Sequence, residues 1–157
     1  MDIIFVDKSV PGYRALLDEL SEHYSVHILD TNQNALGQIA NIIGNESNLG
    51  SLHIVSHGES GVLKFSSGSI TTDNAKNFSK DLITIGNALG KGGDVHLYGC
   101  DIGGGGKGEE FLQLLSIISG VDFAASDDIS GSPSFGGDWN LETTVGRIES
   151  ASLYLSS

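Results

Sequence analysis

The chain has 157 residues, of which 20 are acidic and only 8 are Lys or Arg, so its formal net charge is −12. This charge excludes nucleic acid and anionic membranes as expected partners, because binding phosphate groups requires clustered Lys and Arg. A domain of this size buries roughly 68–70% of its unfolded surface, and no stretch approaches the ~20 apolar residues of a membrane span. We therefore expect a single domain over residues 1–157, without a membrane span.

In chain order, short apolar stretches alternate with amphipathic helical patterns. The first half predicts a strand over residues 3–6, a helix opened by Pro11 and Gly12, a strand over 25–29 ending in a turn and helix cap at 30–32, a helix marked by Ala35, Ile39, Ile42 and Ile43, and a strand over 52–56. The second half predicts a small hairpin of residues 62–65 and 69–71, a helix over about 72–89, a strand over 95–98, a helix over 109–118, a strand over 121–125, and a remainder of loop and short antiparallel strands.

Five apolar strands separated by helices predict an α/β fold with a mainly parallel sheet and right-handed crossovers. The strand order 2-1-3-4-5 is the expected one, with the hairpin inserted after the third strand. This order would line up four residues at the carboxyl ends of the strands, namely Asp7, His57, Cys100 and Asp127.

The two dipeptides His57-Gly58 and Gly99-Cys100 each follow a strand directly. In an open parallel sheet, ligands bind at the carboxyl ends of the strands. If the third and fourth strands are neighbours, a histidine base and the only thiol of the chain therefore share one crevice. That pair predicts nucleophilic catalysis by Cys100 with His57 as its acid–base partner.

In this strand context, the His-Gly and Gly-Cys pairs resemble those of the caspase-like cysteine peptidases, which include caspases, gingipains, clostripain, separase and CHAT domains. Nearly the whole chain is similar to the caspase-like domain found near the amino terminus of very large, repeat-containing bacterial surface proteins and adhesins. The likeness is carried by Phe5-Val6-Asp7, His53-Ile54-Val55-Ser56-His57-Gly58, Leu97-Tyr98-Gly99-Cys100, Ala125-Ser126-Asp127-Asp128 and Gly136-Gly137-Asp138-Trp139.

The resemblance implies a three-layer caspase- or flavodoxin-like sandwich and a polypeptide substrate. It also implies a place at the bacterial cell surface, within a larger exported protein whose export signals lie elsewhere. No signal peptide precedes the first strand, which argues against Sec export of this chain as written. Caspases carry Gln-Ala-Cys where this chain has Tyr98-Gly99-Cys100, so caspase-type specificity for aspartate is not expected.

Peptidase chemistry assigns a role to each residue of the pair. The Cys100 thiolate would attack the peptide carbonyl, and a helix behind the glycine run 103–106 could favour the thiolate through its amino-terminal amides. His57 would protonate the leaving amine and later activate water. The main-chain amides of Gly58 and Cys100 would form an oxyanion hole. No cofactor is required.

Three acidic residues at strand ends have open roles. Asp7 could orient the His57 imidazole, or it could cap the turn that follows its strand. Asp127 and Asp128 could line a substrate pocket that selects a basic side chain, could bind a structural calcium ion, or could form a solvated loop. Trp139 is expected to pack in the core.

Other interpretations of the same residues compete with the peptidase. The run Gly103–Gly108 fits the dinucleotide pattern G-x-G-x-x-G, with Asp127-Asp128 about 20 residues later, but it follows the fourth strand and lacks a Walker Lys-Ser/Thr step. Cys100 could be a buried small hydrophobe. His53 and His96 lie about 13 Å along their strands from His57 and Cys100, so the four cannot ligate one zinc ion.

Two functions follow. The first is a cysteine endopeptidase that processes a large bacterial surface protein, including its own parent chain by autoproteolysis. The second is a non-catalytic module of the same fold that serves adhesin anchoring or folding, in which Cys100 and His57 carry out no chemistry.

Overall fold

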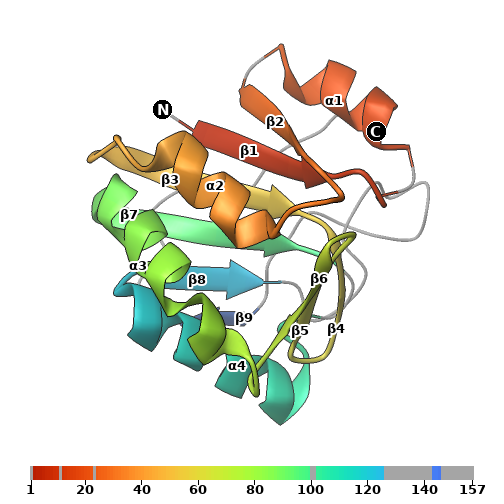
Figure 1. Cartoon of the computed structure of the whole chain (residues 1–157). Coiled ribbons are helices and arrows are strands. Elements are labelled where there is room, and N and C mark those ends of the chain that lie inside the picture. The colour runs from red at the N-terminus through yellow and green to blue at the C-terminus, as the bar shows by residue number, and fades with distance from the viewer. Residues whose placement is uncertain (1, 11, 23, 100–101, 126–142, 146–157) are drawn as a thin grey trace.

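The computed structural model describes residues 2–10, 12–22, 24–99, 102–125 and 143–145, which form an α/β fold (Figure 1). In chain order the elements are β1 (Asp2–Asp7), α1 (Tyr13–Leu20), β2 (Ser25–Leu29), α2 (Ala35–Ile43), β3 (Leu49–Val55), β4 (His57–Glu59), β5 (Val62–Phe65), β6 (Gly68–Thr71), the 3-10 helix η1 (Ala75–Phe78), α3 (Ser79–Ala88), β7 (Leu89–Tyr98), α4 (Gly105–Ser119), β8 (Asp122–Ala125) and β9 (Thr143–Val145).

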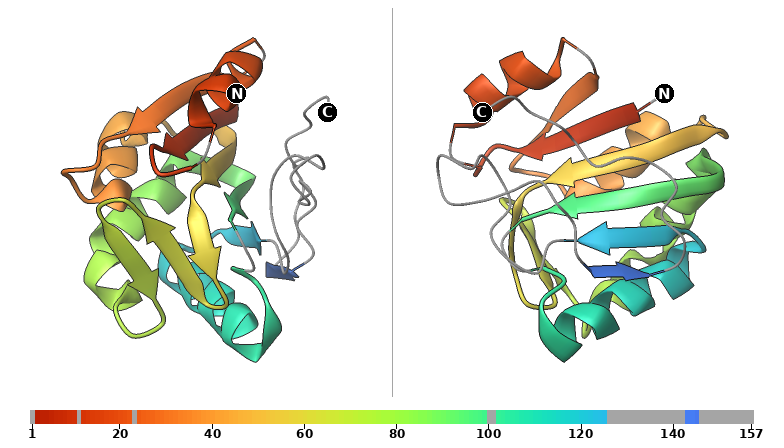
Figure 2. Two further views of the ribbon diagram at one scale, coloured as in Figure 1. Left: turned by 90° about the vertical axis from the view of Figure 1, so that its right-hand side faces the viewer. Right: turned by 180° about the vertical axis from the view of Figure 1, so that it is seen from behind.

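The central sheet has six strands in the order β2-β1-β3-β7-β8-β9. All neighbours are parallel except β9, which is antiparallel to β8. Strands β4, β5 and β6 form a separate antiparallel sheet, which stands at the carboxyl ends of the parallel strands (Figure 2). The predicted α/β class, the mainly parallel sheet and the small hairpin are therefore confirmed.

Successive side chains of a strand point to opposite faces of the sheet, so the buried strands divide the core in two. On one face, alternate residues such as Phe5, Ile54 and Leu97 pack with α2, α3 and α4 (Figure 1). On the other face, Ile4 and Val55 pack with Leu20 of α1. Helices thus cover both faces, and the edge where the strands end is left for the loops and the small sheet.

Several element boundaries differ from the sequence expectation. The helix expected over 72–89 is η1 followed by α3, and Leu89 instead begins β7, where it pairs with Leu49. The glycines and Lys91 that follow Leu89 have no strand-like apolar pattern, so only residues 95–98 were expected in that strand. Helix α4 starts within the glycine run rather than at Glu109, and Asn34, rather than residues 30–32, caps α2 by accepting a hydrogen bond from the Leu36 N–H.

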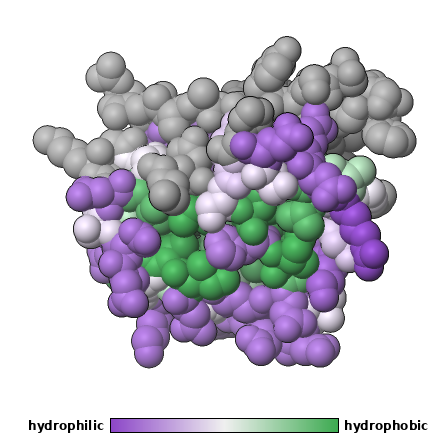
Figure 3. All heavy atoms as spheres, turned by 90° about the horizontal axis from the view of Figure 1, so that it is seen from above, coloured by the Kyte–Doolittle hydropathy of each residue, from purple (hydrophilic) through white to green (hydrophobic). Residues whose placement is uncertain are grey.

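In the described part of the chain, the edge strands β6 and β2 differ in whether a side chain bonds to their outer main-chain groups. At β6, the Asn74 side chain donates to the Ser69 carbonyl at 2.9 Å and accepts from the Thr71 N–H at 2.8 Å. It thereby imitates the peptide group of a neighbouring parallel strand. Strand β2 pairs only with β1 in the described sheet, and the side of the molecule on which α1 and β2 lie carries apolar side chains framed by hydrophilic ones (Figure 3).

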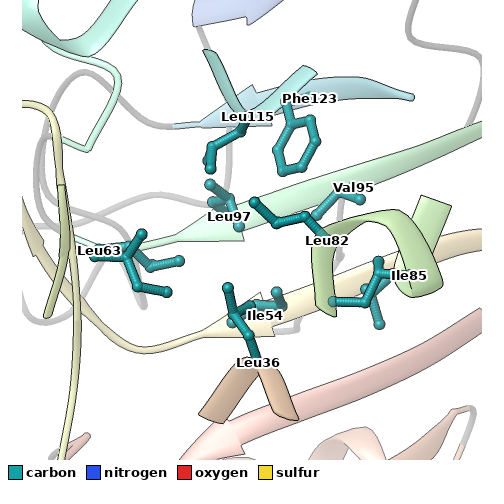
Figure 4. Close-up of a pocket in the computed structure, with 11 residues that line it drawn as sticks. Leu36, Ile54, Leu63, Leu82, Ile85, Val95, Leu97, Leu115 and Phe123 are labelled. Carbon is teal, nitrogen blue, oxygen red and sulfur yellow. The ribbon is translucent and has the colours of Figure 1, made fainter. Parts of the chain in front are cut away.

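A small cavity of about 10 Å³ lies between the sheet and the helices α2, α3 and α4 (Figure 4). Its walls are apolar side chains only, with Leu36, Leu63 and Phe123 among them. A space of this size is at the lower limit for one water molecule, and it offers such a molecule no polar partner. The cavity is therefore a packing gap of the core.

Candidate active site

The ends of β3 and β7 lie side by side at the carboxyl edge of the sheet. Val55 pairs with Tyr98 in the parallel register, and the Ser56 N–H donates to the Tyr98 carbonyl at 2.9 Å. Gly99 approaches so closely that a Cβ there would lie 3.1 Å from both the Ser56 oxygen and the His57 carbonyl carbon. The predicted adjacency of these strands is confirmed, and the backbone just before Cys100 contacts the backbone of His57.

Several predicted site residues lie outside the described part of the chain. These are Cys100, Asp127, Asp128 and Trp139. The nucleophile, the pocket and the calcium site therefore stay predictions. What the structure does place is the main chain leading to Cys100 and the histidine proposed as its partner.

The His57 side chain is half-buried at the start of β4 rather than in a loop. Its Nε2 lies 2.8 Å from the carbonyl oxygen of Ser9. A carbonyl oxygen can only accept a hydrogen bond, so this partner places the proton on Nε2. In the neutral ring, Nδ1 is then the nitrogen able to accept a proton, as a general base requires.

Asp7 is buried at the end of β1, where four donors from two segments reach its carboxylate. Ser9 donates from its N–H at 3.1 Å and from its hydroxyl, and Ser66 donates from its N–H at 3.1 Å and from its hydroxyl at 2.7 Å. Burial raises the pKa of this carboxyl, but the hydrogen bonds from Ser9 and Ser66 outweigh it, so the pKa is lowered overall.

These contacts bear on both roles considered for Asp7. The bond to the Ser9 N–H, two residues ahead, is the turn-capping contact expected of a strand-end aspartate. The described contacts connect Asp7 to His57 indirectly, because Ser9 bonds to the carboxylate and also accepts from the imidazole. Asp7 therefore fixes the residue that holds the ring.

Gly58 follows His57 in β4 and pairs with Leu63, and its proposed oxyanion role stays a prediction. The small sheet turns Leu63 toward the core, while His57 and its cross-strand neighbour Lys64 share the other face. Lys64 is paired with the exposed Glu59 at 2.5 Å. Exposed ion pairs contribute about 0–1 kcal/mol, so this pair can open without a large penalty.

The glycine run 103–108 spans the end of the β7–α4 connection and the first turn of α4. Gly105 has a φ of +64°, a backbone conformation that residues other than glycine rarely adopt. Gly108 packs on Gly103 so tightly that a Cβ would lie 2.1 Å from the Gly103 carbonyl carbon. Local chain geometry thus explains two of these glycines without a bound nucleotide.

A buried polar layer lies on the sheet face opposite α2, α3 and α4. The His53 ring is bonded to the Ser51 hydroxyl at 2.9 Å and to the Tyr98 hydroxyl at 3.1 Å, and it stacks on His96 with a centroid separation of 4.6 Å. Burial, followed by the neighbouring His96, lowers the pKa of His53 to about 3. Both histidines are strand residues, as expected from their spacing.

Sequence reasoning missed the serines of the site. The spacing Asp7-x-Ser9 is that of an aspartate capping its own turn, so Ser9 could have been found. Ser66 could not, because 59 residues separate it from Asp7. Among the described residues, no group of three or more His, Cys, Asp or Glu side chains is arranged to hold a metal ion.

A family model described as a domain of unknown function, DUF4347, matches residues 3–157. The chain belongs to the DUF4347 family. No curated protein matches this DUF4347 chain, and no solved structure matches it either. Within the described residues of this family member, no helix is both long and apolar enough to cross a membrane.

Proposed function

We propose that this chain is a caspase-like cysteine endopeptidase domain in which Cys100 is the nucleophile and His57 the acid–base catalyst. The observation that carries the proposal is the close approach of Gly99 to the main chain of Ser56 and His57. Gly99 directly precedes the only cysteine of the chain, and it lies against the main chain of His57, which carries the imidazole. A Cys–His pair requires this proximity.

The reaction follows from the hydrogen bond that holds His57. Nδ1 takes the proton of the Cys100 thiol, and the thiolate forms a bond to the substrate carbonyl carbon while the carbonyl oxygen becomes an oxyanion. The protonated imidazole then donates to the leaving amine as the carbon–nitrogen bond breaks, which leaves a thioester. Water loses a proton to Nδ1 and attacks this thioester, and the carbon–sulfur bond breaks to release the acid and the thiolate.

Ser9 and Asp7 support this cycle without taking part in it. The imidazole becomes positively charged when it takes the thiol proton, and the Ser9 carbonyl accepts from Nε2–H in both charge states. The buried carboxylate of Asp7 lies one hydrogen bond further away, where it accepts from Ser9 and holds that residue in place. The main-chain amides of Gly58 and Cys100 are the proposed donors to the oxyanion.

The natural substrate in this proposal is a polypeptide, including the parent chain of a large bacterial surface protein. Asp127 and Asp128 are the proposed pocket for a basic side chain, with calcium as a structural ion of the same acidic loop. The resemblance to adhesin-borne domains is the basis for these assignments and for the extracellular location.

The test uses the single thiol of the chain as its own reporter. The 157-residue chain and its parent are treated with a thiol-directed peptidase probe, beside the variants Cys100→Ala, His57→Ala and the control His27→Gln. His27 is a half-buried histidine of β2 that stacks on Phe5, away from the proposed crevice. We expect labelling and parent cleavage in the wild type and in His27→Gln only.

Two outcomes would contradict the proposal. If the thiol reacts with an ordinary pH dependence that His57→Ala leaves unchanged, there is no dyad. If the parent is cut in the same way in the Cys100→Ala and His57→Ala variants, another protease does the cutting, and the domain is a non-catalytic module of the adhesin.

A further inference from the structure

The turn between β4 and β5 binds the loop that follows Cys100. The Ser60 hydroxyl donates to the Gly104 carbonyl at 2.5 Å, and the Gly61 N–H donates to the Ile102 carbonyl at 3.0 Å. His57 begins the short strand that leads into this turn, and Ile102 follows Cys100 by two residues. The two hydrogen bonds therefore connect the segment of the histidine with the segment of the thiol.

The fit between the turn and α4 leaves no room for a side chain at Gly61. Its φ is +73°, and a Cβ there would lie 2.9 Å from the carbonyl oxygen of Lys107 in the first turn of the helix. Real Cβ atoms essentially never approach so closely. Either the turn or the helix start would have to shift to accommodate an alanine.

The other turn of the same three-stranded sheet, between β5 and β6, is anchored to the histidine side of the site. Ser66, which follows β5, donates its N–H and hydroxyl to Asp7, the residue that holds Ser9 in place. Between the two turns, Leu63 and Phe65 of β5 are buried in the core. Their burial anchors the strand that separates the two turns. One small three-stranded sheet thus contacts both loops of the proposed site.

We infer that the Ser60–Gly61 turn positions the Cys100 loop relative to His57. The inference rests on the proposed function and deepens it, because it assigns the setting of the thiol–imidazole separation to the turn between β4 and β5. Ser60 is a positioning residue, since its hydroxyl acts on the Gly104 carbonyl. Loss of this contact releases the loop on one side of the dyad while the Ser9 bond keeps the imidazole on the other.

Two glycines of the small three-stranded sheet provide a matched pair of variants. Gly61 and Gly68 both have a positive φ, of +73° and +145°, so alanine strains the backbone at either position. Only Gly61 has a neighbour in the way, because nothing lies within 4 Å of a Cβ at Gly68. The measurement is the alkylation rate of Cys100 by iodoacetamide as a function of pH.

Gly61→Ala should slow alkylation near neutral pH by about tenfold, because a displacement of about 1 Å costs up to roughly 10²-fold in a positioned site. It should also move the midpoint of the pH profile toward that of a free thiol. Gly68→Ala should stay within about twofold of the wild type, as an exposed change away from the loop. Equal rates and midpoints in the two variants would overturn the inference.

The serine variants keep the inference testable if Gly61→Ala fails to fold. Ser60→Ala removes the hydroxyl, Ser60→Thr restores one, and Ser67→Ala is the control because Ser67 is exposed in the other turn. Ser60→Ala should shift the pH profile, and Ser60→Thr should return it toward the wild type. In a His57→Ala background the shift should vanish; a shift of the same size there would show that the turn does not act on the pair.

Hydrogen exchange separates failure of this inference from failure of the peptidase. If the wild-type thiol reacts with the pH dependence of a free thiol and independently of His57, the proposed function is wrong. The contact between the Ser60–Gly61 turn and the loop after Cys100 is then tested by amide exchange over residues 102–108. Ser60→Ala should then accelerate exchange in that segment, while Ser67→Ala should not. Unchanged exchange in Ser60→Ala would overturn the role of the turn by itself.

Discussion

The imidazole of His57 donates a hydrogen bond from Nε2 to the main-chain carbonyl of Ser9, 2.8 Å away and 48 residues earlier in the chain. A side-chain substitution cannot remove a carbonyl, so the partner of the ring is independent of the side chain at position 9. What can be altered is the support of that carbonyl. Ser9 is held by the carboxylate of Asp7, so a substitution at Asp7 can test how the Ser9 carbonyl is held in place.

Replacing Asp7 by Asn should destabilise the fold and loosen His57. Both carboxylate oxygens accept from the Ser66 N–H, whereas an amide offers one oxygen and would turn its own donors toward other donors. Leaving buried groups unsatisfied costs about 1–3 kcal/mol. Urea unfolding of Asp7→Asn should show this loss relative to Asp30→Asn, an exposed aspartate just after β2; equal unfolding midpoints in the two variants would contradict the role of the carboxylate.

Mild acid should destabilise the fold through His53. Its pKa is about 3 in the folded chain and 6.5 ordinarily, so between these values the unfolded chain binds a proton that the folded chain excludes. The free energy of unfolding should therefore fall as the pH drops, by up to about 1.4 kcal/mol per pH unit. The contribution of Asp7 has a different window, because its lowered pKa stabilises the fold above 3.8 and is lost only below that pH.

Urea titrations at about pH 7 and about pH 4.5 test this pH dependence. His53→Gln should lower the stability at neutral pH, because it disturbs the bonds to Ser51 and Tyr98, but it should flatten the dependence on pH. The control His27→Gln should keep the wild-type slope. A slope that persists unchanged in His53→Gln would assign the acid sensitivity to another group.

Alanine at Gly99 should be far more harmful than alanine at Gly106. The end of the Ile102 side chain could move away from a new Cβ, but the main-chain atoms of Ser56 and His57 at 3.1 Å could not move without disturbing the strand ends. Overpacking of this kind costs about 1–3 kcal/mol. At Gly106, within α4, a Cβ meets nothing within 4 Å, so alanine should stabilise the helix by about 0.5–1 kcal/mol.

Thermal unfolding and Cys100 labelling measure both effects of the glycine variants. Gly99→Ala should lower the melting temperature and reduce labelling by the peptidase probe, whereas Gly106→Ala should raise the melting temperature. If both variants label like the wild type, the approach of Gly99 to His57 has no part in placing the thiol.

Removing the Asn74 side chain should expose the edge of β6. Asn74→Ala leaves the Ser69 carbonyl and the Thr71 N–H without the partner that imitates a strand. We expect a loss of about 1 kcal/mol and concentration-dependent self-association, because an open edge pairs with other strands. Light scattering after size exclusion should show larger species than for Asn77→Ala, an exposed neighbour; identical elution would argue that the edge needs no cap.

The parallel strands of the sheet could be located from the sequence, because each contains a short apolar run followed by a clear break. Residues 25–29 and the hairpin strand 62–65 have the bounds expected from their pattern. The same pattern predicted too short a strand for β7, because its first half carries glycines and Lys91 in place of apolar residues. That half is a strand because Leu89 pairs with Leu49 across the sheet, and tertiary pairing of this kind leaves no local signal.

The candidate site was predictable at the level of strand ends but not at the level of its supporting contacts. His57 and Gly99 could be placed together because parallel strands end at one edge. The serine at position 60 could not be recognised, since its partner Gly104 lies 44 residues away in a run of near-identical glycines. The sequence also contained no sign that His57 begins a separate strand, because β4 is only three residues long.

The long-range bonds of strand β4 and the turn after it also determine when the site can form during synthesis. The Ser9–His57 bond can form once the first third of the chain and the start of β4 have left the ribosome, but the bond from Ser60 needs Gly104. Contacts between segments far apart in sequence form late, because the intervening chain must first be closed into a loop. The imidazole can therefore be held by Ser9 before the thiol leaves the exit tunnel, whereas the turn proposed to position the thiol finds its partner only after Gly104 has emerged. Any cutting of the parent has to wait until that later segment has folded.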